Sequence, residues 1–288
     1  MRALIFGASG QIGVPLVARL RDAGWAVDAV SRTAREASSG ITWHRGSLDA
    51  MPAVPQAFDA IFSCGPLDGF ARWYRDAPVE CARVVAFGST SAAVKHDSPD
   101  AAERDVAARL AWAEMTLFET AAQRGAAATV LRPTLVYGAG RDATLTRIAA
   151  LARRRRVFPL PRGATGLRQP VHVEDLADAA FACIDNAAVA GRGYEVPGGE
   201  TLAYREMVAR VLACLQPPAR LVELPPPLFS LALRGAALMG IGAGLGDAAV
   251  ARMREDLVFD AGPAARDLGY APRPFRPAAR MFQPVGAD

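Results

Sequence analysis

The stretch that decides the fold is Gly7-Ala8-Ser9-Gly10-Gln11-Ile12-Gly13, close to the start of a 288-residue chain. An apolar run precedes it and an amphipathic pattern follows it, as expected for a strand, a tight turn and a helix. The first glycine permits the turn, the second lets the backbone approach a pyrophosphate, and the third lets helix pack on strand. Free N–H groups at the helix start attract phosphate. The predicted dinucleotide contacts are Gly7, Ser9, Gly10, Gln11, Ile12 and Gly13; a plain strand-to-helix turn is the alternative.

Strand and helix patterns alternate through the first two-thirds of the chain. Apolar runs predict strands at residues 3–6, 26–30, 41–43, 60–63, 84–88 and 129–131, and an alanine-rich helix spans about 101–124. Such alternation indicates a parallel sheet with right-handed crossovers. We therefore expect an α/β fold, a Rossmann-type doubly wound parallel sheet with a smaller C-terminal substrate lobe. The expected division is residues 1–190 and 191–288, an approximate boundary with some exchange of segments.

The end of the second predicted strand bears on the choice of cofactor. An acidic residue there would bind the ribose 2′-hydroxyl of NAD, but Asp28 comes too early, inside the strand. Arg32 follows the strand and can offer a forked pair of donors to a 2′-phosphate, with Ser31 and Thr33 adding donors. This pattern favours NADP(H), with NAD(H) as the other option. A solvated surface arginine is the competing interpretation of Arg32.

Composition excludes several classes of protein. The net charge is +4, Lys95 is the only lysine, and basic residues do not alternate with aromatic ones, so nucleic acid is not an expected partner. Scattered arginines suit anionic small molecules better. The four cysteines form no C-x-x-C pair and the three histidines lie far apart, so no metal is expected. No signal peptide or apolar run of membrane-spanning length is seen, so a membrane partner is not expected and a cytoplasmic location is the default expectation.

Four further segments, spaced along the chain after the glycine turn, bear on the family of the protein. They are Phe87-Gly88-Ser89-Thr90-Ser91, the LRPTLVYG segment at 131–138, the RQPVHVEDLA segment at 168–177, and DLVFD followed by DLGY at 256–260 and 267–270. Together with the glycine turn, they resemble the extended or atypical short-chain dehydrogenase/reductases, the NAD-dependent epimerase/dehydratase group. The resemblance covers nearly the whole chain. It implies an oxidoreductase or epimerase/dehydratase acting on a sugar nucleotide, and a homodimer is among its expected assemblies.

The chemistry of that family depends on a Tyr-x-x-x-Lys pair, which this chain lacks. None of its five tyrosines has a lysine four positions on. Counting back from Arg132, the pair falls near Ala108 and Trp112. Alanine transfers no proton, and tryptophan cannot replace an ammonium group, although it can stack on a ring. The family's proton transfer therefore does not carry over intact.

Other residues are candidates for the chemistry. Ser89, Thr90 or Ser91 would orient a substrate hydroxyl, or form only a polar strand end. Tyr137, with Arg141 nearby, would donate a proton, although we favour a packing role. Glu114 is a third candidate, as a general base or as a solvated helix-face acid.

The resemblance also suggests roles around the substrate. It implies that Arg168 contacts the substrate's diphosphate, with the arginine run at 153–156 adding attraction or forming a solvated helix end. His172 is expected to be structural, and Asp175 to cap a helix beginning near Leu176.

Two functions remain open at this point. The first is an NADP(H)-dependent oxidoreductase or epimerase-like enzyme for a sugar nucleotide or similar anionic molecule, with altered acid and base groups. The second is a non-catalytic NADP(H)-binding redox sensor or assembly factor, which the loss of Tyr-x-x-x-Lys supports.

Overall fold

The computed structural model describes residues 1–36, 39–231 and 247–283. The chain divides into two compact units, each made of segments that are distant in sequence. The first unit comprises Met1–Thr134, Val173–Pro197 and Asp260–Pro272. The second comprises Leu135–His172, Gly198–Phe259 and Arg273–Asp288.

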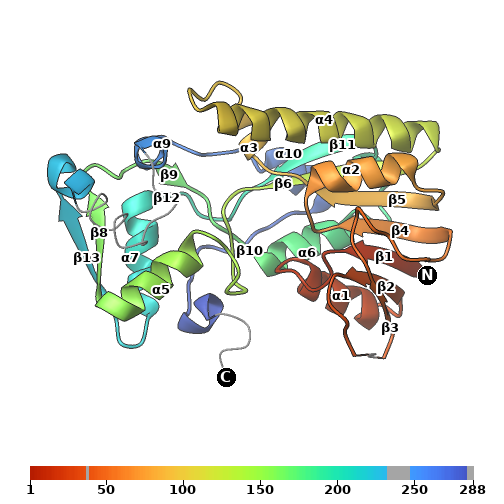
Figure 1. The fold of residues 1–288 in the computed structure, drawn as a ribbon, viewed down its shortest axis with the longest axis horizontal. Helices are drawn as coiled ribbons and strands as arrows, with labels where there is room; N and C mark the ends of the chain where they lie inside the picture. The colour runs from red at the N-terminus through yellow and green to blue at the C-terminus, as the bar shows by residue number, and fades with distance from the viewer. Residues whose placement is uncertain (37–38, 232–246, 284–288) are drawn as a thin grey trace. The chain divides into compact units, whose positions relative to one another are not determined.

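A seven-stranded sheet forms the centre of the first unit (Figure 1). Its strand order is β11-β6-β5-β4-β1-β2-β3, and every neighbouring pair is parallel. The strands are β1 (Arg2–Phe6), β2 (Ala26–Ser31), β3 (Ile41–Arg45), β4 (Ala57–Ser63), β5 (Glu80–Phe87), β6 (Ala127–Pro133) and β11 (Arg192–Val196). The order reverses between β1 and β4, which is where parallel sheets of this kind bind ligands, at the carboxyl ends of the strands.

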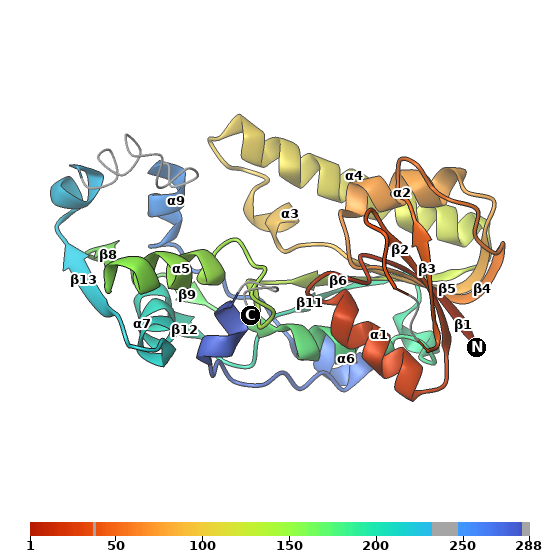
Figure 2. The ribbon, with the colours of Figure 1, turned by 60° about the horizontal axis from the view of Figure 1, so that its bottom comes forward.

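Helices cover both faces of this sheet (Figures 1 and 2). One face carries α2 (Leu67–Asp76) and α4 (Ala101–Gln123), and the other carries α1 (Gly13–Asp22) and α6 (Val173–Ala182). The unit also contains α3 (Ser91–Val94), the 3-10 turn η1 (Ala187–Val189) and α10 (Gly262–Leu268). Beneath α2 and α4 lies an apolar core in which Phe6, Phe70 and Trp73 are in mutual ring contact.

The second unit is built from short strand pairs and helices around its own apolar core. The strand pairs are β7 (Val136–Tyr137) with β10 (Val171–His172), β8 (Val157–Pro161) with β13 (Arg220–Leu224), and β9 (Leu167–Arg168) with β12 (Leu202–Ala203). The helices are α5 (Leu145–Arg155), α7 (Tyr204–Cys214), α9 (Asp247–Arg252) and the 3-10 turn η2 (Ala279–Phe282). Within the described residues, none of the helices is both long and apolar enough to cross a bilayer.

The structure confirms the expected Rossmann-type α/β fold and differs from the expected domain boundary. A single division at residue 190 would separate β11 from the sheet, although β11 pairs along its length with β6. It would also assign residues 135–172 to the first unit, whereas these residues pack in the second. The chain passes between the two units five times, so a single boundary cannot divide it.

Candidate functional site

The glycine turn follows β1 and closes against the end of β4. Gly7 has a positive φ of 73°, and a Cβ there would lie 2.9 Å from the Cys64 carbonyl carbon and oxygen. The Gly10 N–H donates to the Gly7 carbonyl at 2.7 Å, and a Cβ on Gly10 would stand 2.9 Å from that oxygen. A Cβ on Gly13 would overlap the same carbonyl oxygen. Close backbone approaches therefore require glycine at all three positions.

The turn also leaves polar atoms without protein partners. Ile12 caps α1 without a side-chain hydrogen bond, and the first turn of α1 contains no acidic residue. Among the described residues, two buried side-chain oxygens have no hydrogen-bond partner, Gln11 Oε1 and Ser63 Oγ. Ser63 is the last residue of β4 and pairs in register with Phe6, directly before the turn. Buried polar atoms are normally paired, so these two fit a bound polar ligand at the strand ends. The residues present thus fit a dinucleotide.

The two charged residues near the end of β2 differ in exposure: Asp28 is buried within the strand and Arg32 is exposed after it. Asp28 is only 1% exposed and accepts hydrogen bonds from Arg2 Nε at 2.6 Å and from His44 Nε2 at 2.7 Å. Its carboxylate is therefore committed inside the sheet, as its early position in the strand predicted. Ser31 is buried and its hydroxyl accepts from the Thr33 N–H at 3.3 Å, while Arg32 is exposed beyond the strand end.

The hydroxyl residues that follow β5, Ser89, Thr90 and Ser91, differ in burial and in hydrogen bonding. Thr90 is buried, and its hydroxyl donates to the Pro133 carbonyl at 3.2 Å, so it anchors the loop to β6. Ser89 Oγ accepts from the Ser91 N–H at 3.1 Å and shapes the start of α3. Ser91 is half-buried on the first turn of α3. Of the three expected candidates, Thr90 and Ser89 have hydroxyls engaged in holding the loop, whereas no side-chain hydrogen bond is made by the Ser91 hydroxyl among the described residues.

Glu114 is not the solvated helix-face acid considered from sequence. It is buried on α4, and Arg132 holds its carboxylate from two nitrogens, Nε at 2.9 and 3.0 Å and Nη2 at 2.5 Å. Arg132 also reaches Glu195 at 3.2 Å, and its hydrogen bonds to Glu114 raise the pKa of its guanidinium. A Cβ on Gly193 would lie 2.5 Å from Arg132 Nη2, so glycine makes room for the arginine. Glu114 is thus an anchor between α4 and β6.

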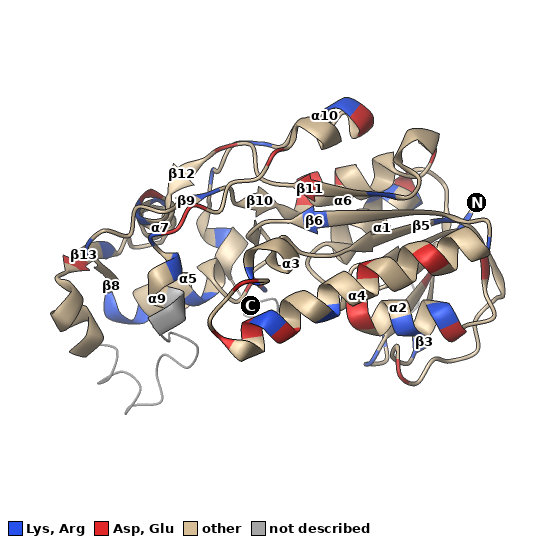
Figure 3. Ribbon diagram, turned by 90° about the horizontal axis from the view of Figure 1, so that it is seen from above, with Lys and Arg blue, Asp and Glu red and all other residues tan. Residues whose placement is uncertain are grey.

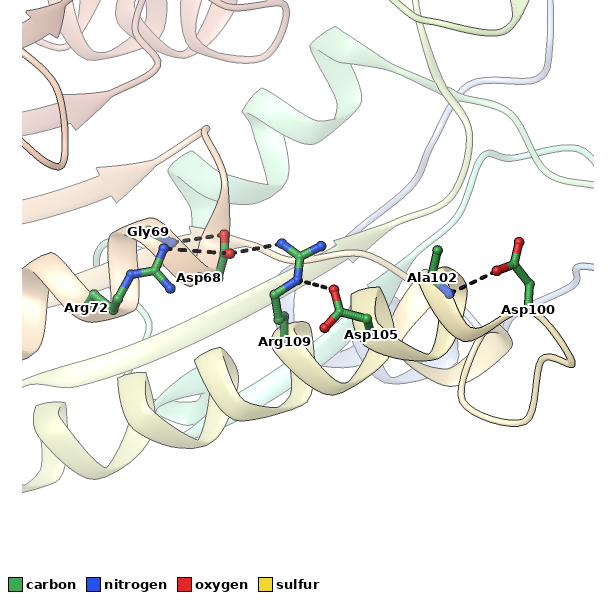
Figure 4. A network of polar contacts seen from close by, with 7 residues as sticks. All are labelled: Asp68, Gly69, Arg72, Asp100, Ala102, Asp105 and Arg109. Carbon is green, nitrogen blue, oxygen red and sulfur yellow. Dashed lines mark hydrogen bonds and ion pairs between the residues drawn. The ribbon is translucent and has the colours of Figure 1, made fainter. Parts of the chain in front are cut away.

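The part of α4 near the expected Tyr-x-x-x-Lys pair faces α2 or solvent. Ala108 is exposed, and Trp112 packs against the core with the Arg72 guanidinium 6.0 Å from its ring centroid. Polar contacts join α4 to α2 (Figure 4). Arg109 of α4 donates to Asp105 of the same helix at 2.9 Å and to Asp68 of α2 at 3.2 Å. These groups fasten the helices together, and none of them replaces the missing acid–base pair.

Lys95, the only lysine in the chain, approaches Glu103 at 3.9 Å. Asp175 lies within the first turn of α6, because that helix begins at Val173, and not at Leu176 as expected. It is therefore an acid that complements the helix dipole from inside the helix.

Two expected site residues are buried within the second unit. Tyr137 is 1% exposed and makes edge contacts with His172 at 5.1 Å and Phe275 at 4.9 Å between ring centroids. Tyr137 therefore packs in the apolar core of the second unit, which is the role favoured from the sequence, and His172 packs against its ring. Arg168 is 7% exposed and donates to the carbonyls of Leu167, Glu255 and Arg252. Its burial lowers the pKa of its guanidinium, and its donors hold backbone instead of a diphosphate.

Comparisons with known proteins agree with this geometry. Residues 71–196 match the model of the NAD dependent epimerase/dehydratase family. The chain is 29% identical over 143 residues to a UDP-glucose 4-epimerase of Vibrio cholerae, which covers 49% of this chain and 42% of that protein. The chain spans less than half the length of the curated relatives it matches.

Solved structures share the fold over nearly the whole chain. The epimerase Mth375 from Methanothermobacter thermautotrophicus superposes with a TM-score of 0.72 at 16% identity, covering 98% of this chain and 90% of that one. MoeE5, solved in complex with UDP-glucuronic acid and NAD, gives a TM-score of 0.68 at 18% identity, covering 98% and 96%. At such identities the likeness shows the fold alone.

Proposed function

From the premise that residues 71–196 belong to the NAD dependent epimerase/dehydratase family, we propose that this protein binds NADP(H) in its first unit. We further propose that it acts as an oxidoreductase or epimerase/dehydratase-like enzyme on a sugar nucleotide or a similar anionic small molecule. The observation that carries the proposal is the glycine turn, in which three close backbone approaches and the orphaned Gln11 and Ser63 oxygens meet at the strand ends.

The state of Asp28 supports NADP(H) over NAD(H). An acid that binds the ribose 2′-hydroxyl must be free at the end of the second strand. Asp28 instead holds Arg2 and His44, whereas Arg32 is exposed at the strand end beside Ser31. A guanidinium fork is well matched to a 2′-phosphate. MoeE5 was solved with NAD, so this preference would distinguish the chain from that structural relative.

The chain's own residues would position the reactants. A bound nicotinamide supplies reversible hydride transfer. Ser91 would orient a substrate hydroxyl or carbonyl by hydrogen bonding, because it begins α3, the short helix that follows the carboxyl end of β5. Thr90 and Ser89 would hold that loop in place. Substrate class rests on the UDP-sugar relatives and on the arginine-rich composition.

A non-catalytic NADP(H)-binding protein, such as a redox sensor or assembly factor, is the second candidate. The observation that favours it is that the expected acid and base residues are ion-paired, buried or replaced. Glu114 is held by Arg132, Tyr137 is buried, and Ala108 stands where the family's tyrosine is expected. A fold of this kind supports binding without turnover.

Cofactor choice is tested by titrating the full chain with NADPH and NADH and following protein fluorescence. Arg32→Gln is expected to weaken NADPH binding by roughly 1.5–3 kcal/mol, about 10- to 150-fold, and to leave NADH binding unchanged. Arg35→Gln is the matched control, because Arg35 stacks 5.2 Å from the Trp43 ring centroid. Equal losses for both nucleotides in Arg32→Gln would reject the 2′-phosphate assignment.

Turnover separates the two candidates. The enzyme proposal expects NADPH consumption, or interconversion of epimers, with a panel of UDP-sugars and carbonyl compounds, and expects Ser91→Ala to lower kcat with little change in NADPH affinity. Tight NADPH binding without turnover across the panel, together with recovery of a partner protein, would favour the non-catalytic function.

A further inference from the structure

Charge is divided unequally between the two units. The second unit contains 17 arginines and no lysine against 8 acidic residues, a formal net charge of +9. The first unit contains 16 basic against 21 acidic residues, a net charge of −5. The modest total of +4 therefore conceals a strongly basic second unit.

Part of that charge lies beside a two-stranded sheet with one open face. Strands β8 and β13 pair in parallel, with Val157 opposite Arg220 and Pro159 opposite Val222. Alternate residues of a strand point to opposite faces, so these four side chains share one face. That face is exposed, with Val157 at 40% and Val222 at 38%. The opposite face places Phe158 and Leu221 on the core of the unit.

Exposed arginines directly precede β8 in the chain. Arg154 and Arg155 are exposed in the last turn of α5, and that turn leads directly into β8. Figure 3 shows basic residues along this end of α5 and the turn into β8. Among the described residues, the guanidinium groups of Arg154, Arg155 and Arg220 form no ion pair with a carboxylate.

Two exposed leucines follow β13 in the chain. Leu228 is 54% exposed and Leu231 is 65% exposed in the helical turns that follow β13, although Phe229 between them is buried. Of the large hydrophobic residues that are exposed in the described structure, half lie on this small region of the second unit. Arginines and aliphatic side chains thus occur together.

We propose that this basic apolar face, formed by Arg154, Arg155, Val157, Arg220, Val222 and Leu228, docks on an anionic phospholipid surface. Interfacial binding combines buried aliphatic side chains with basic residues that attract acidic headgroups. A single-stranded nucleic acid would be expected to stack on exposed aromatic rings, but Phe158 and Phe229 face inward. A nucleotide site would be concave with donors converging on one point, whereas these arginines border an open strand pair.

The test is flotation of the full chain with vesicles of phosphatidylcholine alone or mixed with phosphatidylglycerol. Binding is expected only with the acidic lipid and is expected to fall in 0.5 M salt. Arg154→Gln with Arg155→Gln is expected to raise the half-saturating lipid concentration roughly 25-fold, about fivefold per arginine. The matched control, Arg21→Gln with Arg266→Gln, removes two exposed charges from the first unit and is expected to bind like the wild type.

A second variant separates lipid from a soluble polyanion. Val222→Ser with Leu228→Ser is expected to weaken vesicle binding severalfold while leaving retention on heparin unchanged. The proposal is overturned if the chain ignores acidic vesicles, if it binds neutral vesicles equally, or if the arginine pair and its control lose the same affinity. It is also overturned if the serine variant binds vesicles like the wild type. NADPH affinity is expected to be unchanged throughout, so these outcomes are independent of the cofactor proposal.

Discussion

Replacing Glu114 with glutamine tests whether this acid is an anchor or a base. The substitution removes the charge that Arg132 holds from Nε and Nη2, yet keeps a similar shape and one acceptor oxygen. Loss of one partner from a fully buried ion pair costs about 3–5 kcal/mol. The Arg132 side chain is 25% exposed and retains Glu195 at 3.2 Å. We therefore expect a smaller loss in the free energy of unfolding, about 2 kcal/mol.

Calorimetry measures this loss directly. A change of 1 kcal/mol shifts Tm by roughly 2–4 °C in domains of 150–250 residues, so Glu114→Gln is expected to melt at least about 4 °C lower. Glu119→Gln is the matched control, because Glu119 is an exposed acid on the same helix. Its Tm is expected to stay within about 1 °C of the wild type, since exposed substitutions change stability little.

Cofactor binding then separates the two roles. As an anchor, Glu114 touches no reactant, so NADPH affinity measured well below the melting transition is expected to be unchanged. As a general base, Glu114 would be needed for turnover and not for stability. A Glu114→Gln variant that melts like the wild type but loses turnover would refute the anchor role.

Two further substitutions probe the turn and the sheet. Gly10→Ala is expected to weaken NADPH binding more than tenfold with an unchanged circular dichroism spectrum, because its Cβ would lie 2.9 Å from the rigid Gly7 carbonyl oxygen; normal binding by a folded variant would remove the turn from the site. Burial alone would raise the pKa of Asp28, but hydrogen bonds from Arg2 and His44 outweigh it and lower that pKa. The stability that Asp28 adds is therefore present above its unfolded pKa of about 3.9 and is lost as pH falls through the lower folded value, so the gap in Tm between the wild type and Asp28→Asn is expected to close below about pH 4. A gap that persists in acid would contradict this sign.

Local sequence signals were enough to predict the sheet and the glycine turn. Strand periodicity and the glycine spacing act over a few residues, so β1, α1 and β2 lie where the patterns placed them, within a residue or two. Helix α2 was not predicted, although Phe70, Trp73 and Tyr74 recur at helical spacing and are buried. These aromatics lie between glycine and aspartate residues that resemble a loop. The helix was missed because the helical spacing of the aromatics competes with the loop-like residues around them. In the folded protein these aromatics are buried, and the segment is a helix.

The roles of charged residues depend on partners far along the chain, which no local pattern identifies. Arg168 resembles an arginine that contacts a diphosphate in the family, yet its donors reach carbonyls 84 and 87 positions away. Glu114 and Arg132 are 18 positions apart and meet only because α4 packs on β6. In both cases the carboxylate or guanidinium is satisfied by the fold before any ligand arrives. Among the described residues, the buried side-chain atoms left without a partner are Gln11 Oε1 and Ser63 Oγ beside the glycine turn, which favours ligand binding over proton transfer. Any catalysis would depend on groups that the substrate brings or that Ser91 orients.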